Sequence, residues 1–392
     1  MNKKSILIAL AKENNQRNDI SDVLRCGKSI RNVLLKKNIK TDIFFVKKND
    51  FNDILKLKKA ILNKNPSCVF NLFEGFSDAP FWEAEFAKII EMANIPFTGN
   101  SSFTLAACLD KAKTKNILKN EGVAVPRGMV IKNIKNLIPL PEFHGLLPWS
   151  NGGKAPRNPE DSRGKVPEIA SHTGRRFLGR RRPAGAGRMK KVPRAIPVWA
   201  PEIDNLIFPV FVKPCSEDAS VGIGNDSLVY CKNELLAVLR KRLREFPRGL
   251  IVEDFLPGEE YSVAFLGNNP YEVLGVSVIN YSLYKNLPQF LTYASKWDKK
   301  TNEFKKIMPS RGAVIDKNLK KGIISMAVKA AKALGCRGYF RIDLRAKCGK
   351  IFVIDANPNP DINIDSGYVK QAIQGGHSYI ELIEKIIRLT GV

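Results

Sequence analysis

The stretch GYFRIDLRAKCGKIFVIDANPNP, residues 338–360, carries the strongest signal for both fold and site. Its two apolar runs predict β-strands over residues 338–345 and 350–355. Successive side chains of a strand point to opposite faces of a sheet, so alternate polar residues of each run lie together. We therefore expect a polar patch wherever these two strands pair.

Four residues would form that patch. Arg341 and Asp343 share one face of the first strand, and Asp355 and Asn357 share one face of the second. The three oxygen donors suit Mg²⁺ shared with nucleotide phosphates, while the arginine is a cation that stabilises developing negative charge. A surface ladder of charge pairs is the alternative, but the apolar neighbours favour a buried site.

A second motif, VFVKPCSEDASVGIG at residues 210–224, places Lys213 at the end of a predicted strand, followed by a loop of small residues. Such a loop can bring backbone N–H groups against phosphate oxygens while the lysine supplies a point charge. The alternative is an ordinary turn after a strand. The spacing is not GxxxxGK[ST], so a Walker-type loop is not indicated.

A third motif, LIVEDFLPGEEYSV at residues 250–263, is a strand that ends in an acid, a Pro-Gly turn and a second strand. Glu253 and nearby backbone are placed to contact an adenine edge, and Glu260 to hold ribose hydroxyls. Taken alone, this pattern also fits a solvated acidic hairpin.

The first 99 residues alternate apolar runs with helical periodicity, which predicts a parallel sheet covered by helices. The expected elements there are strands at 6–11, 41–47 and 67–71 and helices at 22–36, 54–62 and 82–93. Further on, we expect a helix from 102 to about 122, a strand at 208–214, a helix within 228–246, strands at 249–254, 260–266 and 272–280, and helices at 317–334 and 377–389.

Residues 141–205 differ from the rest of the chain. They hold nine prolines and eight glycines, and arginine exceeds lysine there, whereas lysine dominates elsewhere. We interpret the segment as a disordered insertion foreign to the fold, from a mobile-element read-through or a compensated frameshift. The alternative is an acquired basic arm that binds nucleic acid.

Composition excludes several classes of protein. The chain has 392 residues, and its 64 lysines and arginines against 38 acids give a net charge of +26, which suggests an anionic partner. Its seven scattered cysteines form no CxxC pair and its three histidines no cluster, so a disulfide framework, a zinc site and a histidine triad are not expected. No apolar run is long enough to span a membrane, and we expect a cytoplasmic protein.

In their order along the chain, these motifs resemble the ATP-grasp superfamily, and within it the D-alanine–D-alanine ligase-like branch. The resemblance covers nearly all of the chain outside 141–205 and rests on NLFEG at 71–75, IPFTGN at 95–100, LDKAKTK at 109–115, VKPCSEDASVGIG at 212–224, IVEDFLPGEEYSV at 251–263, FRIDL at 340–344 and IDANPNPDI at 354–362. It implies an N-terminal α/β (pre-ATP-grasp) domain at 1–99, then an α+β ATP-grasp fold of two subdomains, 100–264 with its insertion and the catalytic 265–392.

The resemblance also implies ATP, two Mg²⁺ ions with Mn²⁺ as a substitute, and ADP-forming ligation of a carboxylate to an amine through an acyl phosphate. The residues that match ATP-contacting positions are Lys111, Lys213, Ser220, Val221, Gly222, Glu253, Leu256, Glu260 and Lys296. The matching metal ligands are Asp343, Asp355 and Asn357, and the catalytic positions are Arg341, Lys296 and Ser220.

Departures from the family pattern concern the substrate. Glu74 stands where a histidine is usual, Asp361 where a glycine is usual, and Trp297 where a tyrosine is usual. We take Glu74, Asp361 and Ser366 as candidate substrate residues. Small carboxylate and amine substrates are the expected partners, a homodimer is allowed for, and no nucleic acid is expected unless the insertion binds it. The alternative function is an ATP-binding protein without catalytic activity.

Overall fold

A computed structural model describes residues 4–13, 18–133, 205–218, 220–281, 287–307 and 315–392, with the side chains of 18–21 left aside. The segment 141–205, apart from its last residue, lies outside this part of the chain. The expectations about that insertion therefore stay predictions, as do the domain boundaries. No helix of the described part is long and apolar enough to cross a membrane.

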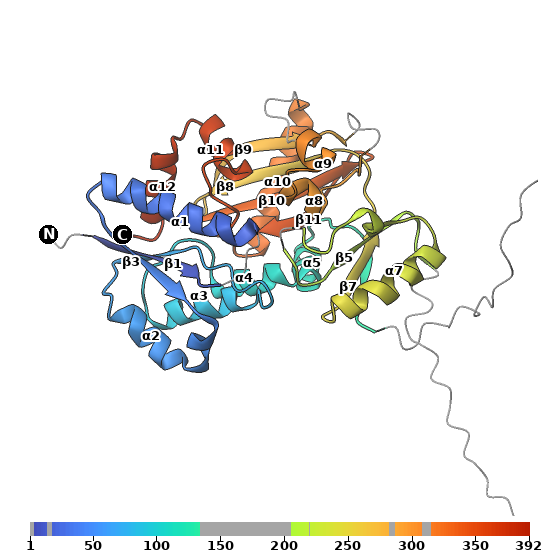
Figure 1. The fold of residues 1–392 in the computed structure, drawn as a ribbon. Coiled ribbons are helices and arrows are strands. Elements are labelled where there is room, and N and C mark those ends of the chain that lie inside the picture. Colours follow the sequence, from blue (N-terminus) through green and yellow to red (C-terminus); the bar gives the residue numbers. More distant parts are fainter. Residues whose placement is uncertain (1–3, 14–17, 134–204, 219, 282–286, 308–314) are drawn as a thin grey trace, which may run out of the picture. The chain divides into compact units, whose positions relative to one another are not determined.

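The N-terminal elements form a parallel sheet, as the sequence predicts, and its strand order is β2-β1-β3. Figure 1 shows β1 and β3 beside the helices of this part. The elements are β1 (Ser5–Ala11), α1 (Asn18–Lys36), β2 (Lys40–Val46), η1 (Lys48–Asn52), α2 (Ile54–Leu62), β3 (Cys68–Asn71) and α3 (Trp82–Met92).

The central strand β1 is buried on both faces because its side chains alternate between two helical layers. Ile6, Ile8 and Leu10 belong to the core that includes α1 and α12 (Tyr379–Arg388), whereas Leu7 packs into the core of α2 and α3. An apolar residue at every position is what a sheet covered on both sides requires.

One predicted helix is two. α4 (Ser102–Leu109) ends where α5 (Lys111–Asn120) begins, because Asp110 leaves the helical conformation. Its carboxylate accepts hydrogen bonds from the backbone N–H groups of Ala112 and Lys113, both at 3.0 Å, and so caps α5. The break makes Lys111 the first residue of the second helix.

A four-stranded antiparallel sheet has the order β4-β7-β5-β6. Its first strand was not predicted: four residues next to the insertion are too few for a clear alternation. The elements of this part are β4 (Gly128–Ile131), β5 (Val210–Pro214), η2 (Asn225–Ser227), β6 (Leu228–Val229), α7 (Lys232–Glu245) and β7 (Leu250–Asp254).

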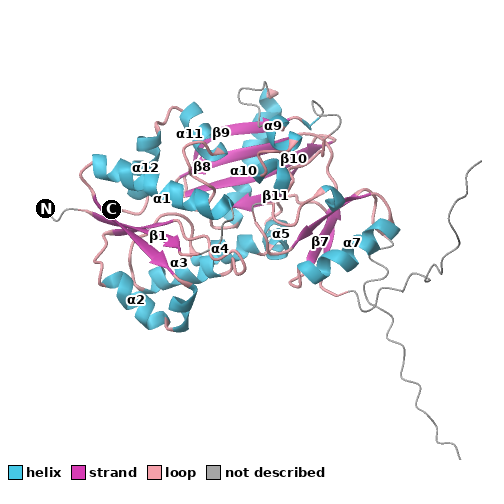
Figure 2. Cartoon of the chain, viewed as in Figure 1, coloured by secondary structure: helices cyan, strands magenta, loops and turns pink. Residues whose placement is uncertain are grey.

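A second four-stranded antiparallel sheet has the order β11-β10-β8-β9, with α10 packed on one face and α11 on the other (Figure 2). The short helices α8, α9 and α11 were not predicted. The elements are β8 (Glu260–Leu266), β9 (Glu272–Ile279), α8 (Tyr293–Trp297), α9 (Asn302–Lys306), α10 (Lys317–Ala333), β10 (Tyr339–Lys347), β11 (Lys350–Asn357) and α11 (Gly367–Gln374).

Candidate functional site

A pocket of about 870 Å³, the main pocket, is lined by residues of both four-stranded sheets. Two predicted residues do not line this pocket. Gly222 lies in the loop beside it, and Arg341 is hydrogen-bonded to Asp343, which does line it. The remaining residues that the sequence assigns to ATP or metal all line it: Lys111, Lys213, Ser220, Val221, Glu253, Leu256, Glu260, Lys296, Asp343, Asp355 and Asn357.

The polar patch predicted from residues 338–360 is confirmed. β10 and β11 pair antiparallel, with Arg341 opposite Asn357 and Asp343 opposite Asp355. The two strands are joined by a tight turn, so local chain geometry brings all four side chains together. The surface-ladder alternative is wrong, since Asp343 is only 6% exposed.

Asp343 is held by donors from three strands. Arg341 donates from Nε and Nη2 to its two carboxylate oxygens, both at 2.8 Å, in a bidentate pair. Asn357 Nδ2 donates at 2.9 Å, and the Ser262 hydroxyl donates from β8 at 2.7 Å. The carboxylate and the guanidinium are therefore fixed in orientation before any ligand arrives.

Asp355 carries its negative charge opposite a buried lysine. Lys111 Nζ lies 3.0 Å from Asp355 Oδ1 and 3.4 Å from Asp218 Oδ1. Burial raises the pKa of Asp355, but Lys111 and then Lys213 outweigh it and lower this pKa to about 2. The same carboxylates raise the pKa of Lys111 against its own burial, so both groups stay charged.

Glu253, 4% exposed, forms the centre of a buried group of three charges. Lys115 Nζ approaches one of its oxygens at 2.7 Å and Lys213 Nζ the other at 3.0 Å. Burial acts to raise the pKa of Glu253, yet the two lysines hold it below its usual value. Lys115 was not predicted, although it lies four residues after Lys111 and so on the same face of α5.

Glu260 is bound by a second residue that the sequence reasoning missed. Arg345 Nη2 donates to Glu260 Oε2 at 3.0 Å, and Arg345 Nη1 donates to the Leu256 carbonyl at 2.6 Å. The Tyr281 hydroxyl donates to the same Glu260 oxygen at 3.1 Å, and its ring lies under the Arg345 guanidinium. A signal was present, because Arg345 follows Arg341 and Asp343 at the same two-residue spacing along β10.

The loop of small residues after β5 is shaped by positive backbone φ angles at Ser220 (+62°) and Gly222 (+72°). Arg242 of α7, only 4% exposed, donates to the Gly222 carbonyl at 2.7 Å and to the Val212 carbonyl at 3.2 Å. This buried guanidinium ties the loop to the strand that precedes it.

Replacing Gly222 by alanine is expected to weaken ATP binding about tenfold or more, because strain of this kind costs about 1–3 kcal/mol. A Cβ there would lie 2.5 Å from Phe246 Cζ and 2.6 Å from Pro214 Cγ. Calorimetric titration with a non-hydrolysable ATP analogue measures the effect. Gly349→Ala is the matched control, since Gly349 also has positive φ but no atom near its Cβ position; equal affinities in both variants would contradict the prediction.

Lys296, on α8, lies in the main pocket near the polar patch. Burial, and after it the positive charge of Arg341, lowers its pKa. The helix is joined to the small-residue loop, because the Tyr293 N–H donates to the Ile223 carbonyl at 3.0 Å. A shift of that loop would therefore be felt at Lys296.

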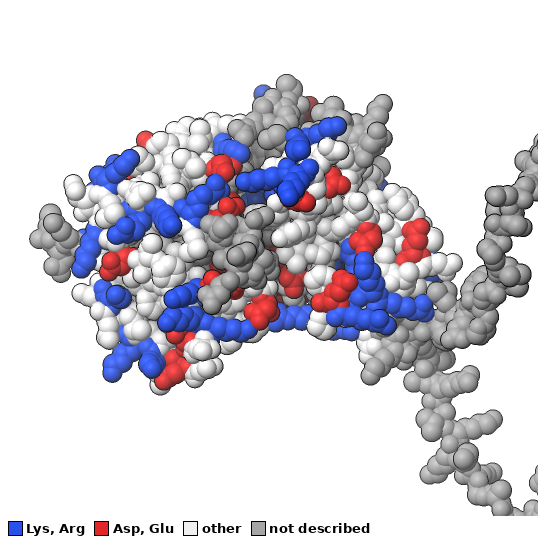
Figure 3. Space-filling model, in the orientation of Figure 1, with Lys and Arg blue, Asp and Glu red and all other residues white. Residues whose placement is uncertain are grey.

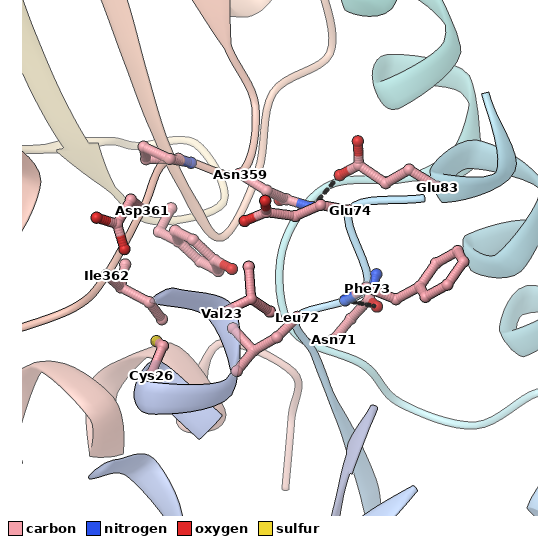
Figure 4. Close-up of a pocket in the computed structure, with 12 residues that line it drawn as sticks. Val23, Cys26, Asn71, Leu72, Phe73, Glu74, Glu83, Asn359, Asp361 and Ile362 are labelled. Carbon is pink, nitrogen blue, oxygen red and sulfur yellow. Dashed lines mark hydrogen bonds between the residues drawn. The ribbon is translucent and has the colours of Figure 1, made fainter. Parts of the chain in front are cut away.

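A second pocket of about 320 Å³ holds two of the three candidate substrate residues, Glu74 and Asp361 (Figure 4). Ser366 does not line it; its hydroxyl accepts a hydrogen bond from the Val369 N–H and caps α11. Glu83, which the sequence reasoning missed, lines this pocket with Asn359.

The residues at the patch fit a magnesium ion. In the described part of the chain no group of three or more His, Cys, Asp or Glu side chains is placed to hold a metal. The candidate set instead combines two carboxylates, Asp343 and Asp355, with the amide of Asn357, and these face the main pocket from paired strands. Ionised carboxylates with an amide oxygen are hard donors, which Mg²⁺ prefers.

The fold and site define a class of protein, and comparison with known families agrees. Residues 189–388 match the family model described as the D-ala D-ala ligase C-terminus. The chain therefore belongs to this family and is a ligase of the ATP-grasp class, as its motifs predict.

Individual relatives extend the likeness beyond the C-terminal part. A D-alanine–D-alanine ligase of Carboxydothermus hydrogenoformans is 26% identical over 304 residues, covering 77% of this chain and 75% of the relative. One from Acetivibrio thermocellus is 34% identical over 186 residues, covering 46% and 45%. The crystal structure of the Bacillus anthracis D-alanine–D-alanine ligase complexed with ATP matches with a TM-score of 0.64 at 19% identity, over 99% of this chain and 97% of that one, which confirms the fold.

Proposed function

We propose that this protein is an ATP-dependent, ADP-forming ligase that joins a small carboxylate to an amine through an acyl phosphate. The observation that carries the proposal is the pairing of β10 with β11 in the main pocket. It sets Arg341 and Asp343 opposite Asn357 and Asp355, beside Lys111. Phosphoryl transfer needs positioning and charge neutralisation more than a protein nucleophile, and this patch provides both.

The cationic part of the pocket would hold the ATP phosphates. Lys111 and Lys213 are each 6% exposed and enter it from different elements, α5 and β5. The backbone of residues Ser220, Val221 and Gly222 would cover the phosphates. Lys111 is paired with Asp355 here, and its positive charge suits a phosphate oxygen equally well.

The adenosine end would lie between apolar and acidic groups. Phe211, Phe255 and Phe290 contact one another and line the pocket, offering a slot for a flat base. Glu253 and Leu256 would contact the adenine, and Glu260, oriented by its arginine partner, would accept hydrogen bonds from ribose hydroxyls.

Asp343, Asp355 and Asn357 would hold Mg²⁺. When bound, the ion neutralises charge on the ATP phosphates. Arg341 and Lys296 would stabilise the charge that develops on the transferred phosphoryl group and on the acyl intermediate.

The chemistry proceeds in two displacements. An oxygen of the substrate carboxylate attacks the γ-phosphorus, the bond to the β-phosphate oxygen breaks, and ADP leaves. The nitrogen of the second substrate then attacks the acyl carbon and expels inorganic phosphate, losing a proton as the C–N bond forms. Holding the reactants together supplies much of the rate enhancement.

Release of ADP is the measurement that tests this proposal. Purified protein with ATP and Mg²⁺ is offered D- and L-amino acids and dipeptides in pairs, and we expect at least one pair to give equal amounts of ADP, phosphate and a C–N-linked product by mass spectrometry. Hydroxylamine in place of the amine is expected to trap the acyl phosphate as a hydroxamate. If ATP binds but no pair releases ADP, the alternative of an inactive ATP-binding protein is correct.

A further inference from the structure

The second pocket has an acidic lining. The carboxylates of Glu74, Glu83 and Asp361 surround it, and no lysine, arginine or histidine is among its described lining residues (Figure 4). They come from three places: the segment after β3, the first turn of α3 and the segment after β11. Tertiary structure, not a local motif, has gathered them.

This acidity runs against the character of the chain, whose net charge is +26. On the face shown in Figure 3, lysines and arginines are spread widely over the described surface. Arg25, which precedes Cys26 of the pocket lining, forms ion pairs at 3.3 Å with Asp22 and at 3.1 Å with Asp365. Inside the pocket the excess charge is negative, so it favours cations where the main pocket favours phosphates.

A buried amide in the same pocket also lacks a partner. Asn71 is 1% exposed, and its Oδ1 accepts a hydrogen bond from the Phe73 N–H at 3.2 Å. Its Nδ2 has no hydrogen-bond partner among the described residues, although buried polar groups are nearly always paired. A ligand oxygen in this pocket would supply the missing acceptor.

The second pocket adjoins the main pocket. Asn359 Nδ2 donates to Glu83 Oε1 at 3.1 Å, and it follows Asn357, a residue of the main pocket, by two positions. Burial, and after it the charge of Asp218 in the main pocket, raises the pKa of Glu83 to about 8. A molecule in the second pocket would therefore lie near the polar patch, beside which the proposed function puts the ATP phosphates.

We propose that the second pocket binds a diamino acid, an amino acid with a second ammonium group on its side chain. The proposal rests on the proposed function, because it names the class of substrate that the ligase takes. A neutral amino acid brings one ammonium to the three carboxyl groups, whereas a diamino acid brings two. The two positive charges would favour the ionised form of these acids, Glu83 included, and the ligand carboxylate offers an acceptor to Asn71 Nδ2.

Binding of ornithine and norleucine to the full-length chain tests the inference directly. The two amino acids have side chains of equal length, but only ornithine carries the second ammonium. Each is titrated by calorimetry as the D and the L form, with a non-hydrolysable ATP analogue and Mg²⁺ present. We expect one form of ornithine to bind at least tenfold more tightly than norleucine. Equal affinities, tighter binding of norleucine, or no binding of either would overturn the inference.

Substitutions in the pocket test whether its acids cause the preference for ornithine over norleucine. In the double variant Glu74→Gln, Asp361→Asn, the preference for ornithine is expected to fall below threefold, while Asp42→Asn, an exposed acid outside the pocket, leaves it unchanged. A preference that survives the double variant would place the site elsewhere and overturn the inference.

Turnover separates this inference from the proposed function. If ornithine binds selectively but neither it nor any other substrate pair releases ADP, the proposed ligase activity is wrong and the inference about the second pocket stands. If neutral amino acids are ligated but ornithine does not bind selectively, the ligase activity stands and the inference about the second pocket is wrong.

Discussion

Replacing Arg341 by alanine is expected to lower the rate of ADP formation by about a hundredfold to a thousandfold, the usual loss when one transition-state donor is removed. Its Nε and Nη2 atoms are both committed to Asp343 at 2.8 Å, so the variant loses a cation and also releases the carboxylate. Steady-state kinetics under saturating ATP measure the effect, and calorimetry with an ATP analogue is expected to show affinity within a few-fold of wild type.

Two further variants control this experiment. Arg341→Lys keeps the charge but not the two-pronged geometry, so it should recover only part of the rate. Arg31→Ala, an exposed arginine of α1, should retain the full rate. A rate in Arg341→Ala within tenfold of wild type would show that this guanidinium does not act in the reaction.

Glu253→Gln is expected to lower the free energy of unfolding by about 3–5 kcal/mol, the usual cost of breaking a buried ion pair. The substitution keeps the shape of the side chain but leaves the ammonium groups of Lys115 and Lys213 buried without their counter-charge. Urea unfolding at neutral pH, followed by circular dichroism, measures the loss. Glu245→Gln, an exposed acid of α7, should change stability by less than about 0.5 kcal/mol.

The pH dependence of this effect has a definite sign. The pKa of Glu253 is lower in the folded protein than in the unfolded chain, so its contribution is present above the pKa of the unfolded chain and is lost as the pH falls through the folded pKa. The gap between wild type and Glu253→Gln should narrow over that acidic range. Adding Lys115→Met to the Glu253→Gln variant should restore part of the stability. If the stability difference from wild type changed neither with pH nor with this second substitution, the buried-charge explanation would be contradicted.

The polar patch was predictable because its causes are local. Alternation along two adjacent strands decides which side chains share a face, and a short turn decides that the strands pair. Arg341, Asp343, Asp355 and Asn357 could therefore be named from residues 338–360, and the structure brings them together. Arg345 follows the same alternation, but it was not predicted because its partner, Glu260, lies on β8.

Other partners depend on contacts between distant parts of the chain. Lys115 meets Glu253 only because α5 packs beside the sheet that holds β7. The single helix expected from 102 to about 122 was wrong for a local reason, since Asp110 is a good N-cap and ends one helix as it begins the next. The position of Lys115 on the face of Lys111 and the capping residue Asp110 were both visible in the sequence. The ion pair between Lys115 and Glu253 was not, because its two residues are far apart in the chain.

The sequence by itself determined most of the strands and helices around the insertion and the polar patch. These features follow from side-chain periodicity, which acts over a few residues. Lys111 and Lys296 were identified through the resemblance of their motifs to a known family. Only the tertiary structure decided that Glu74, Glu83 and Asp361 surround one pocket beside Asn71. Their meeting depends on the packing of the first sheet against the C-terminal segment after β11, and burial gives those charges their effect because it removes the water that would screen them.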